Sequence, residues 1–185
     1  MGPSFTNIIV KGQTQDILVN YLKQLNRIAY VSPTENDYTV VYDQKSEQDL
    51  KQLSDLANQI SKDLTCLAFA ILIYDESVFC YELYEQGKLL DEYNSNPDIH
   101  DNNYNLNNLA FPEGGDAEKI CNKLGVKSMI DKVRPILREP NNSEFYLLAS
   151  TRHKRLVKVL GIPIFWSTDF VGGYRYIDYL NLVLI

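Results

Sequence analysis

The sequence is poor in the residues on which most enzyme and metal sites depend. Its 185 residues include two histidines, three cysteines and one tryptophan. Two histidines cannot build a histidine-rich metal site, and an odd number of well-separated cysteines argues against a disulfide framework and fits a reducing cytoplasm. The chain also lacks the nucleophile-elbow, phosphate-loop, CxxC and HExxH patterns. We therefore expect no cofactor, and the sequence assigns no catalytic residue and no metal ligand.

Positive charge and long apolar runs are scarce as well. The formal net charge is −6 and the sequence pI is about 4.9, whereas general nucleic-acid binding needs a basic surface. No run of apolar residues is long enough for a transmembrane helix. We expect a cytoplasmic protein that binds neither nucleic acid nor membrane.

The charges are unevenly divided along the chain. Residues 1–115 contain 7 Lys and Arg against 17 Asp and Glu, whereas residues 116–185 contain 11 against 7. Two interpretations follow. The two halves dock on each other through complementary charge, or the basic half binds an anion or an acidic partner.

Residues 66–94 predict three β-strands joined by two tight turns. Residues 66–74 are apolar at both alternating sets of positions, so this strand is expected to be covered on both faces. Asp75-Glu76 is predicted as the first turn. Gln86-Gly87 is predicted as the second, because glycine accepts the positive φ that a two-residue hairpin needs.

The elements before this stretch alternate in type. Strands are predicted at 5–11, 28–31 and 38–43, with one helix over 15–26 and another that begins at Ser46. The resulting βαββαβ order is that of a ferredoxin-like sheet, here extended by the β-meander of residues 66–94. The fold class is therefore α+β. Since two helices cover one face, the other face needs a cover, either the C-terminal half or a second copy of the chain.

The remainder of the chain divides into a loop and a mixed helical and strand half. Residues 95–115 are rich in asparagine, which favours irregular structure, and form either a variable surface loop or a binding loop. Residues 1–94, 95–115 and 116–185 are thus the expected units. In the last of these, Asp116 is expected to cap a helix, and Pro135 is expected to kink or divide the helix over 127–138. Residues 143–150 read equally as helix or strand.

Strands are expected at 164–168 and 174–185, around a loop at Gly172-Gly173. The apolar end of the second of these strands should be tied into a sheet.

Two acidic residues form the first candidate site. A turn at Gln86-Gly87 would place Glu82 opposite Asp91 across the second hairpin. Two facing carboxylates could hold a divalent cation or share a proton in acid–base work. They could equally form a solvated strand face, in which water and a neighbouring lysine screen them.

A basic cluster and an aromatic group complete the candidates. The basic cluster consists of Arg152, His153, Lys154, Arg155 and Lys158. On a helix Arg152 and Arg155 are expected to share one face, and Lys154 and Lys158 another. This cluster could bind a phosphate or an acidic partner, or dock on the acidic half. The second group could line a small-molecule or partner pocket, or simply pack at an edge; its members are Trp166, Tyr174 and Arg175.

Three segments carry a family resemblance. They are YELYEQGKLLDEYNSNP, GGDAEKICNKLGV and HKRLVKVLGIP. Together they resemble a group of bacterial, chiefly cyanobacterial, proteins without an assigned function. The resemblance implies a soluble bacterial cytoplasmic protein and implies nothing about chemistry.

The leading hypothesis is a non-catalytic protein that acts through protein or small-ligand interaction, as a homodimer or with another protein. The alternative is an enzyme of unknown class that uses Glu82 with Asp91, or the Arg152–Arg155 cluster.

Overall fold

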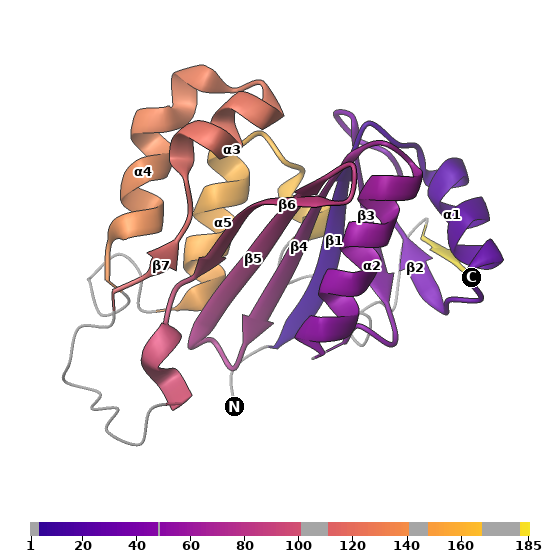
Figure 1. Cartoon of the computed structure of the whole chain (residues 1–185), viewed down its shortest axis with the longest axis horizontal. Helices are drawn as coiled ribbons and strands as arrows, with labels where there is room; N and C mark the ends of the chain where they lie inside the picture. Colours follow the sequence, from indigo (N-terminus) through magenta and orange to yellow (C-terminus); the bar gives the residue numbers. More distant parts are fainter. Residues whose placement is uncertain (1–3, 48, 101–110, 141–147, 168–181) are drawn as a thin grey trace.

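A single antiparallel sheet runs through the molecule (Figure 1). The computed structural model describes residues 4–47, 49–100, 111–140, 148–167 and 182–185. Within these ranges the sheet has eight strands in the order β7-β6-β5-β4-β1-β3-β2-β8, and each neighbouring pair is antiparallel. The strands are β1 (Phe5–Lys11), β2 (Ala29–Val31), β3 (Tyr38–Asp43), β4 (Leu67–Tyr74), β5 (Val78–Glu85), β6 (Lys88–Asn94), β7 (Glu113–Gly114) and β8 (Val183–Leu184).

Helices cover both faces of this sheet, and the predicted α+β class is confirmed. They are α1 (Gln15–Gln24), α2 (Leu50–Asp63), α3 (Ala117–Leu124), α4 (Ile130–Arg138), α5 (Ala149–Val159) and α6 (Ile164–Ser167). Single 3-10 turns lie at Pro97–His100 and Lys127–Met129. No described helix is both long enough and apolar enough to cross a membrane.

Strand β4 lies inside the sheet, between β5 and β1, and both of its faces are buried. Successive side chains of a strand point to opposite faces. Ala68 and Ala70 pack in one apolar cluster with residues of α1 and α2. Phe69 and Ile71 pack in a second cluster with residues of α3, α4 and α5. We call these two sides of the sheet the α2 face and the α5 face.

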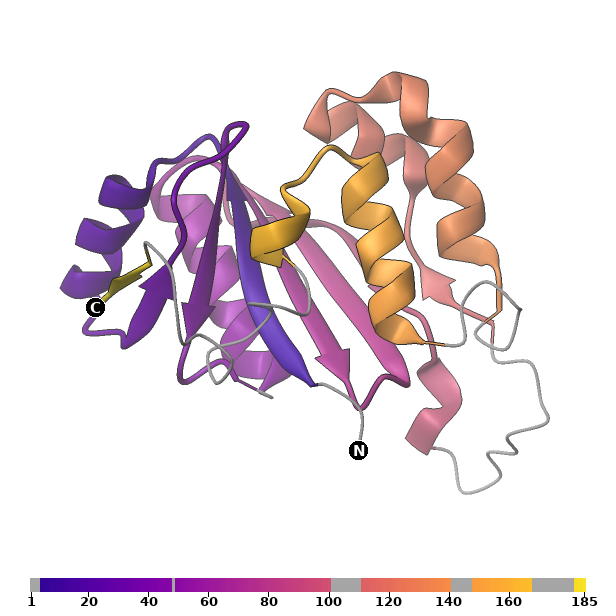
Figure 2. The ribbon, with the colours of Figure 1, turned by 180° about the vertical axis from the view of Figure 1, so that it is seen from behind.

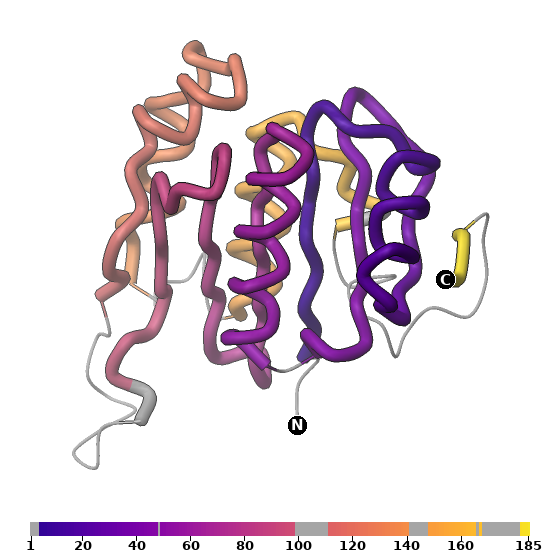
Figure 3. The backbone as a smooth tube through the Cα atoms, turned by 45° about the vertical axis from the view of Figure 1, so that its right-hand side comes forward, coloured from indigo at the N-terminus to yellow at the C-terminus, as the bar shows by residue number. Residues whose placement is uncertain are grey.

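The cover of the α5 face comes from the chain itself. Ile120 of α3, Val133 of α4 and Leu156 of α5 are fully buried against the strands. Figures 2 and 3 show α5 and α2 on opposite sides of the sheet. Of the two predicted sources of this cover, the C-terminal half supplies it, and a second copy is not needed for that purpose.

Of the two hairpins in residues 66–94, the second matches the prediction and the first does not. The second turns at Gln86-Gly87 as expected, with φ of 51° and 75°. The first pairs Tyr74 with Val78, so its loop has three residues instead of two. The register along β4 and β5 is therefore shifted by one from the prediction.

The N-cap of helix α2 lies three residues later than the predicted Ser46. Asp49 is its N-cap, and its carboxylate accepts a 3.0 Å hydrogen bond from the backbone N–H of Gln52. Ser46 instead donates both its backbone N–H and its hydroxyl to Asp43, each at 2.7 Å. These bonds hold the chain after β3 in a turn, which delays the helix.

The C-terminal half departs from prediction at two further places. Pro135 lies inside α4 without dividing it, and the change from a 3-10 turn to an α-helix comes earlier, at Ile130. The strand expected at 164–168 is wrong. Residues Ile164–Ser167 form one helical turn, which the Ser167 hydroxyl closes by donating to the Pro163 carbonyl at 2.7 Å. Of the strand expected at 174–185, the described residues contain β8, which pairs with β2; residues 168–181 lie outside the described ranges.

Candidate functional site

A β-bulge in the second hairpin separates the two predicted acidic partners. The register of β5 and β6 shifts between Leu83 and Tyr84, so Leu83 pairs with Asp91 and Glu82 pairs with Glu92. An extra residue in one strand moves every later side chain to the other face. The predicted pairing of Glu82 with Asp91 is therefore wrong, and Glu92 takes the place of Asp91.

Glu82 and Glu92 lie in a cleft on the α2 face of the sheet. The cleft has a volume of about 260 Å³ and spans β5, β6 and β7 beside the first turn of α2. Glu113 of β7 adds a third carboxylate to its lining. None of the described residues that line it is Lys or Arg; they are Leu50, Cys80, Tyr81, Glu82, Glu92, Tyr93, Asn94, Glu113 and Gly114.

The floor of this cleft carries a negative field. The Tyr84 hydroxyl donates a 2.7 Å hydrogen bond to the Glu82 carboxylate, which fixes that side chain on β5. Burial, together with the nearby Glu82 charge, raises the pKa of the Cys80 thiol to about 12. A thiol with so high a pKa is not a nucleophile near neutral pH. Cys80 is thus unsuited to thiol chemistry in this cleft, which is lined by three carboxylates.

Asp91 has a structural role on the α5 face. It is 8% exposed, and its carboxylate accepts a 2.7 Å hydrogen bond from the Tyr81 hydroxyl. The backbone N–H of Asp116 donates to the same carboxylate at 3.1 Å. Burial and then the Asp91 charge raise the pKa of Tyr81 well above its usual value. Asp91 therefore joins β6 to the start of α3.

The backbone of Gly114-Gly115 passes so close to β6 that there is no room for a side chain at either position. A Cβ on Gly114 would lie 2.1 Å from the Glu92 carbonyl oxygen, and one on Gly115 would lie 2.9 Å from the ring of Tyr93. The Arg138 guanidinium donates to both glycine carbonyls. The segment is thus a strap that fixes β7 against β6.

Asp116 caps α3 as predicted, accepting from the Lys119 N–H at 3.0 Å. A second cleft, of about 420 Å³, opens beside this helix start and is lined by both signs of charge. Its charged residues are Asp116, Glu118, Arg134 and Arg138. Arg134 pairs with Glu118 at 3.1 Å, so this cleft offers no field of one sign to a ligand.

The predicted basic cluster does not form one surface. Arg152 is fully buried and donates to the backbone carbonyls of Ile136 and Glu139, whereas Arg155 is exposed. The expectation that the two arginines share a face is therefore wrong. The apolar stripe of α5 includes Leu156 and Val157, and Arg152 lies on that side of the helix.

His153 is fully buried between two phenylalanine rings. Its ring centroid lies 5.1 Å from that of Phe79 and 6.0 Å from that of Phe5. Neither ring nitrogen has a hydrogen-bond partner among the described residues. Burial lowers the pKa of His153 to about 3, so the imidazole is neutral in the folded protein. This residue belongs to the core.

The aromatic candidates fall largely outside the described ranges. Tyr174 and Arg175 lie among residues 168–181, and Trp166 lies in α6. The predicted pocket of these three residues stays a prediction.

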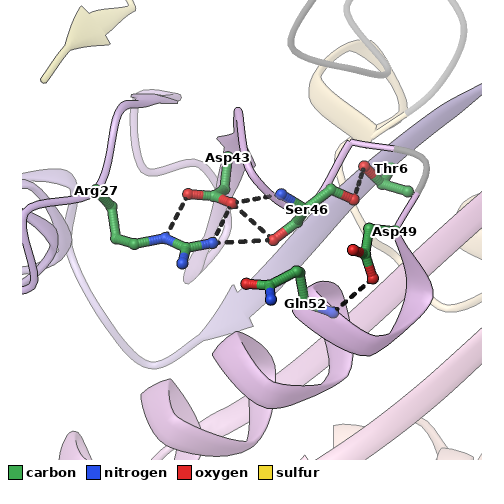
Figure 4. A network of polar contacts seen from close by, with 6 residues as sticks. All are labelled: Thr6, Arg27, Asp43, Ser46, Asp49 and Gln52. Carbon is green, nitrogen blue, oxygen red and sulfur yellow. Dashed lines mark hydrogen bonds and ion pairs between the residues drawn. The ribbon is translucent and has the colours of Figure 1, made fainter.

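Sequence reasoning missed a buried ion pair at the other end of the sheet (Figure 4). Arg27 donates to Asp43 through Nε at 2.7 Å and through a second guanidinium nitrogen, and Asp43 is 3% exposed. Asp43 also binds Ser46, whose carbonyl accepts a 3.0 Å bond from the Thr6 hydroxyl. The network ties β1, the segment before β2 and the turn after β3 together.

Two further observations bear on the role of the cleft, and neither assigns one. Within the described ranges, no group of three or more His, Cys, Asp or Glu side chains is placed to hold a metal ion. No family model, curated protein or solved structure matches the chain.

Proposed function

We propose that this is a non-catalytic binding protein whose cleft over β5, β6 and β7 holds a positively charged group of a partner or small ligand. One observation carries the proposal. Glu82 and Glu92 are paired directly across two strands, and Glu113 lies in the same cleft without a basic lining residue. Like charges directly opposite are destabilising, so a cation between them would relieve their repulsion.

An organic cation fits this cleft better than a metal ion. A metal needs several ligand atoms within about 2–2.6 Å of one point, and the described residues hold no such group. An ammonium or guanidinium instead accepts carboxylates on several sides at hydrogen-bond distance. Leu50, which is 43% exposed, offers an apolar wall for the stem of a lysine or arginine side chain.

The enzyme alternative loses the geometry on which it depended. Asp91 faces away from Glu82, and Arg152 is buried while Arg155 is exposed. A binding role needs only the cleft, its charge and its apolar wall.

We further propose that residues 1–94 are a ferredoxin-like unit extended by β5 and β6. The strand order β4-β1-β3-β2 and the placement of α1 and α2 on one face support this assignment. Membership of the bacterial family and a cytoplasmic location remain predictions.

Hexalysine is a suitable probe for the cleft, with binding measured by titration calorimetry. We expect the wild-type protein to bind it more weakly as salt rises. Glu82→Gln/Glu92→Gln should weaken binding by roughly tenfold or more, because two cleft charges are lost.

The matched control is Asp16→Asn/Asp37→Asn. It removes the same net charge from α1 and from the β2–β3 turn, at the far end of the sheet. An equal loss of affinity in this control, or no measurable binding by the wild type, would contradict the proposal.

A further inference from the structure

The two halves carry opposite net charge, and few of the ion pairs among the described residues run between them. Of the salt bridges between described residues, one joins the halves, Lys123 to Glu85 at 2.6 Å. Both side chains are about a third exposed, where an ion pair contributes little. The predicted docking of the halves by charge is thus a minor part of their contact, which is chiefly apolar.

The outer side of α5 carries a pair of exposed lysines. Lys154 and Lys158 lie one helical turn apart, opposite the buried side of the helix that contains Leu156 and Val157. Residues four apart on a helix have Cβ atoms about 5–6 Å apart. The lysines therefore form a pair of ammonium groups on one ridge.

The spacing of this pair matches that of the cleft. Directly opposed residues of an antiparallel pair have Cβ atoms about 4.5–5.5 Å apart, which applies to Glu82 and Glu92. Each ammonium could therefore meet one carboxylate. Leu50 at the cleft wall would face the lysine stems.

The cleft and the lysine ridge of one molecule cannot meet each other. The cleft opens on the α2 face. Helix α5 lies on the other side of the same sheet, as the ribbon and the tube show (Figures 2 and 3). A second copy can present its ridge to the cleft without any change of fold.

We propose that the occupant of the cleft is α5 of a second copy of this chain, in a head-to-tail contact. This inference rests on the proposed function of the cleft. Each molecule then offers one cleft and one ridge, so the contact uses two different surfaces. Such a heterologous contact forms open chains or closed rings instead of a symmetric dimer. The assembly should weaken with salt, since it depends on exposed charges.

The test is sedimentation velocity on the full chain at low and high salt. At about 50 mM salt we expect the wild type to grow in mass up to about 200 µM protein, and at about 500 mM salt to stay monomeric. Glu82→Gln/Glu92→Gln and Lys154→Gln/Lys158→Gln should each be monomeric at low salt. Circular dichroism checks that both variants are folded.

Mixing the two variants tests the direction of the contact. One retains an intact ridge and the other an intact cleft, so an equal mixture should form a discrete 1:1 heterodimer and no larger species. Growth of the wild type beyond a dimer separates this contact from a two-fold one in which each ridge meets the other molecule's cleft, since a two-fold contact closes at two molecules.

Three outcomes overturn the inference. A wild type that stays monomeric at low salt removes self-association, and if hexalysine still binds the cleft, the proposed binding function stands without it. Assembly that persists in either variant, or a mixture that remains monomeric, places the contact elsewhere on the molecule.

Discussion

At the scale of single residues, His153 makes stability depend on pH. Its pKa is about 3 when folded and about 6.5 when unfolded, because burial disfavours the charged ring. Between these values the unfolded chain binds a proton that the folded chain does not. Above about pH 6.5 the titration of this residue does not lower the free energy of unfolding. Below that pH it lowers the free energy of unfolding progressively, until the pH reaches about 3.

Replacing this residue should remove that part of the pH dependence. Between pH 7.5 and pH 5 we expect His153→Phe to lose about 2 kcal/mol less stability than the wild type. The figure follows from about 1.4 kcal/mol for each pH unit below 6.5. Urea unfolding at both pH values measures it. Equal losses in the two proteins would show that His153 is accessible to protons when folded.

Asp43 and Asp55 are both paired carboxylates, but their surroundings differ. Asp43 is buried and binds Arg27 and Ser46, whereas Asp55 is 62% exposed and pairs with Lys51. We expect Asp43→Asn to cost about 3 kcal/mol of stability, since Arg27 loses its partner. Asp55→Asn should cost less than about 0.5 kcal/mol. Denaturant midpoints compare them, and similar costs would refute the structural role of the Arg27–Asp43 network.

At the scale of elements, α5 is capped from outside its own sequence. Its N-cap residue, Leu148, has no side chain able to accept a hydrogen bond. Glu76, in the loop between β4 and β5, accepts from the Ser150 hydroxyl at 2.6 Å and from its N–H at 3.3 Å. The Glu76 carbonyl also accepts from the Ala149 N–H at 2.9 Å. The first hairpin thus positions the helix that covers the α5 face.

A double-mutant cycle tests this cap. Glu76→Ala should lower stability by about 1 kcal/mol, and it should lower amide protection most in the first turn of α5. With Ser150→Ala and the double variant, we expect a coupling of about 0.5–1 kcal/mol. Purely additive effects would mean that the carboxylate does not act as the cap.

The sequence predicts some features of the hairpins in residues 66–94 and not others. The continuous apolar run of β4 and the glycine at 87 carry enough local signal to predict a strand covered on both sides and a two-residue turn. The bulge beside Leu83 has no such signal, because neither glycine nor proline marks it. It alone decides that Glu92, and not Asp91, faces Glu82.

The buried arginine of α5 could not be predicted for a related reason. Arg152 can be buried because the carbonyls of Ile136 and Glu139, on a different helix and at its end, accept hydrogen bonds from its guanidinium. A helical pattern by itself places a charged residue in solvent. Partners from other elements, not local preference, explain the burial of Arg152 and of the Arg27–Asp43 pair.

At the scale of the whole molecule, one sheet is shared by two helical layers. The sequence divides the chain into units at 1–94 and 116–185, whereas β4 supplies side chains to the clusters on both faces. Elements that share a central strand should unfold together, since opening either layer exposes the same strand.

Two matched core substitutions test this sharing. Ile71 and Ile8 are both fully buried, on the α5 face and on the α2 face respectively. Ile71→Ala and Ile8→Ala should each cost about 2–5 kcal/mol. In hydrogen exchange, we expect either substitution to lower the protection of the slowest amides in α2 and in α5 alike. If Ile71→Ala weakened α5 alone and left α2 at the wild-type level, the two layers would unfold independently, and the sheet would serve as a boundary between two domains instead of as their common core.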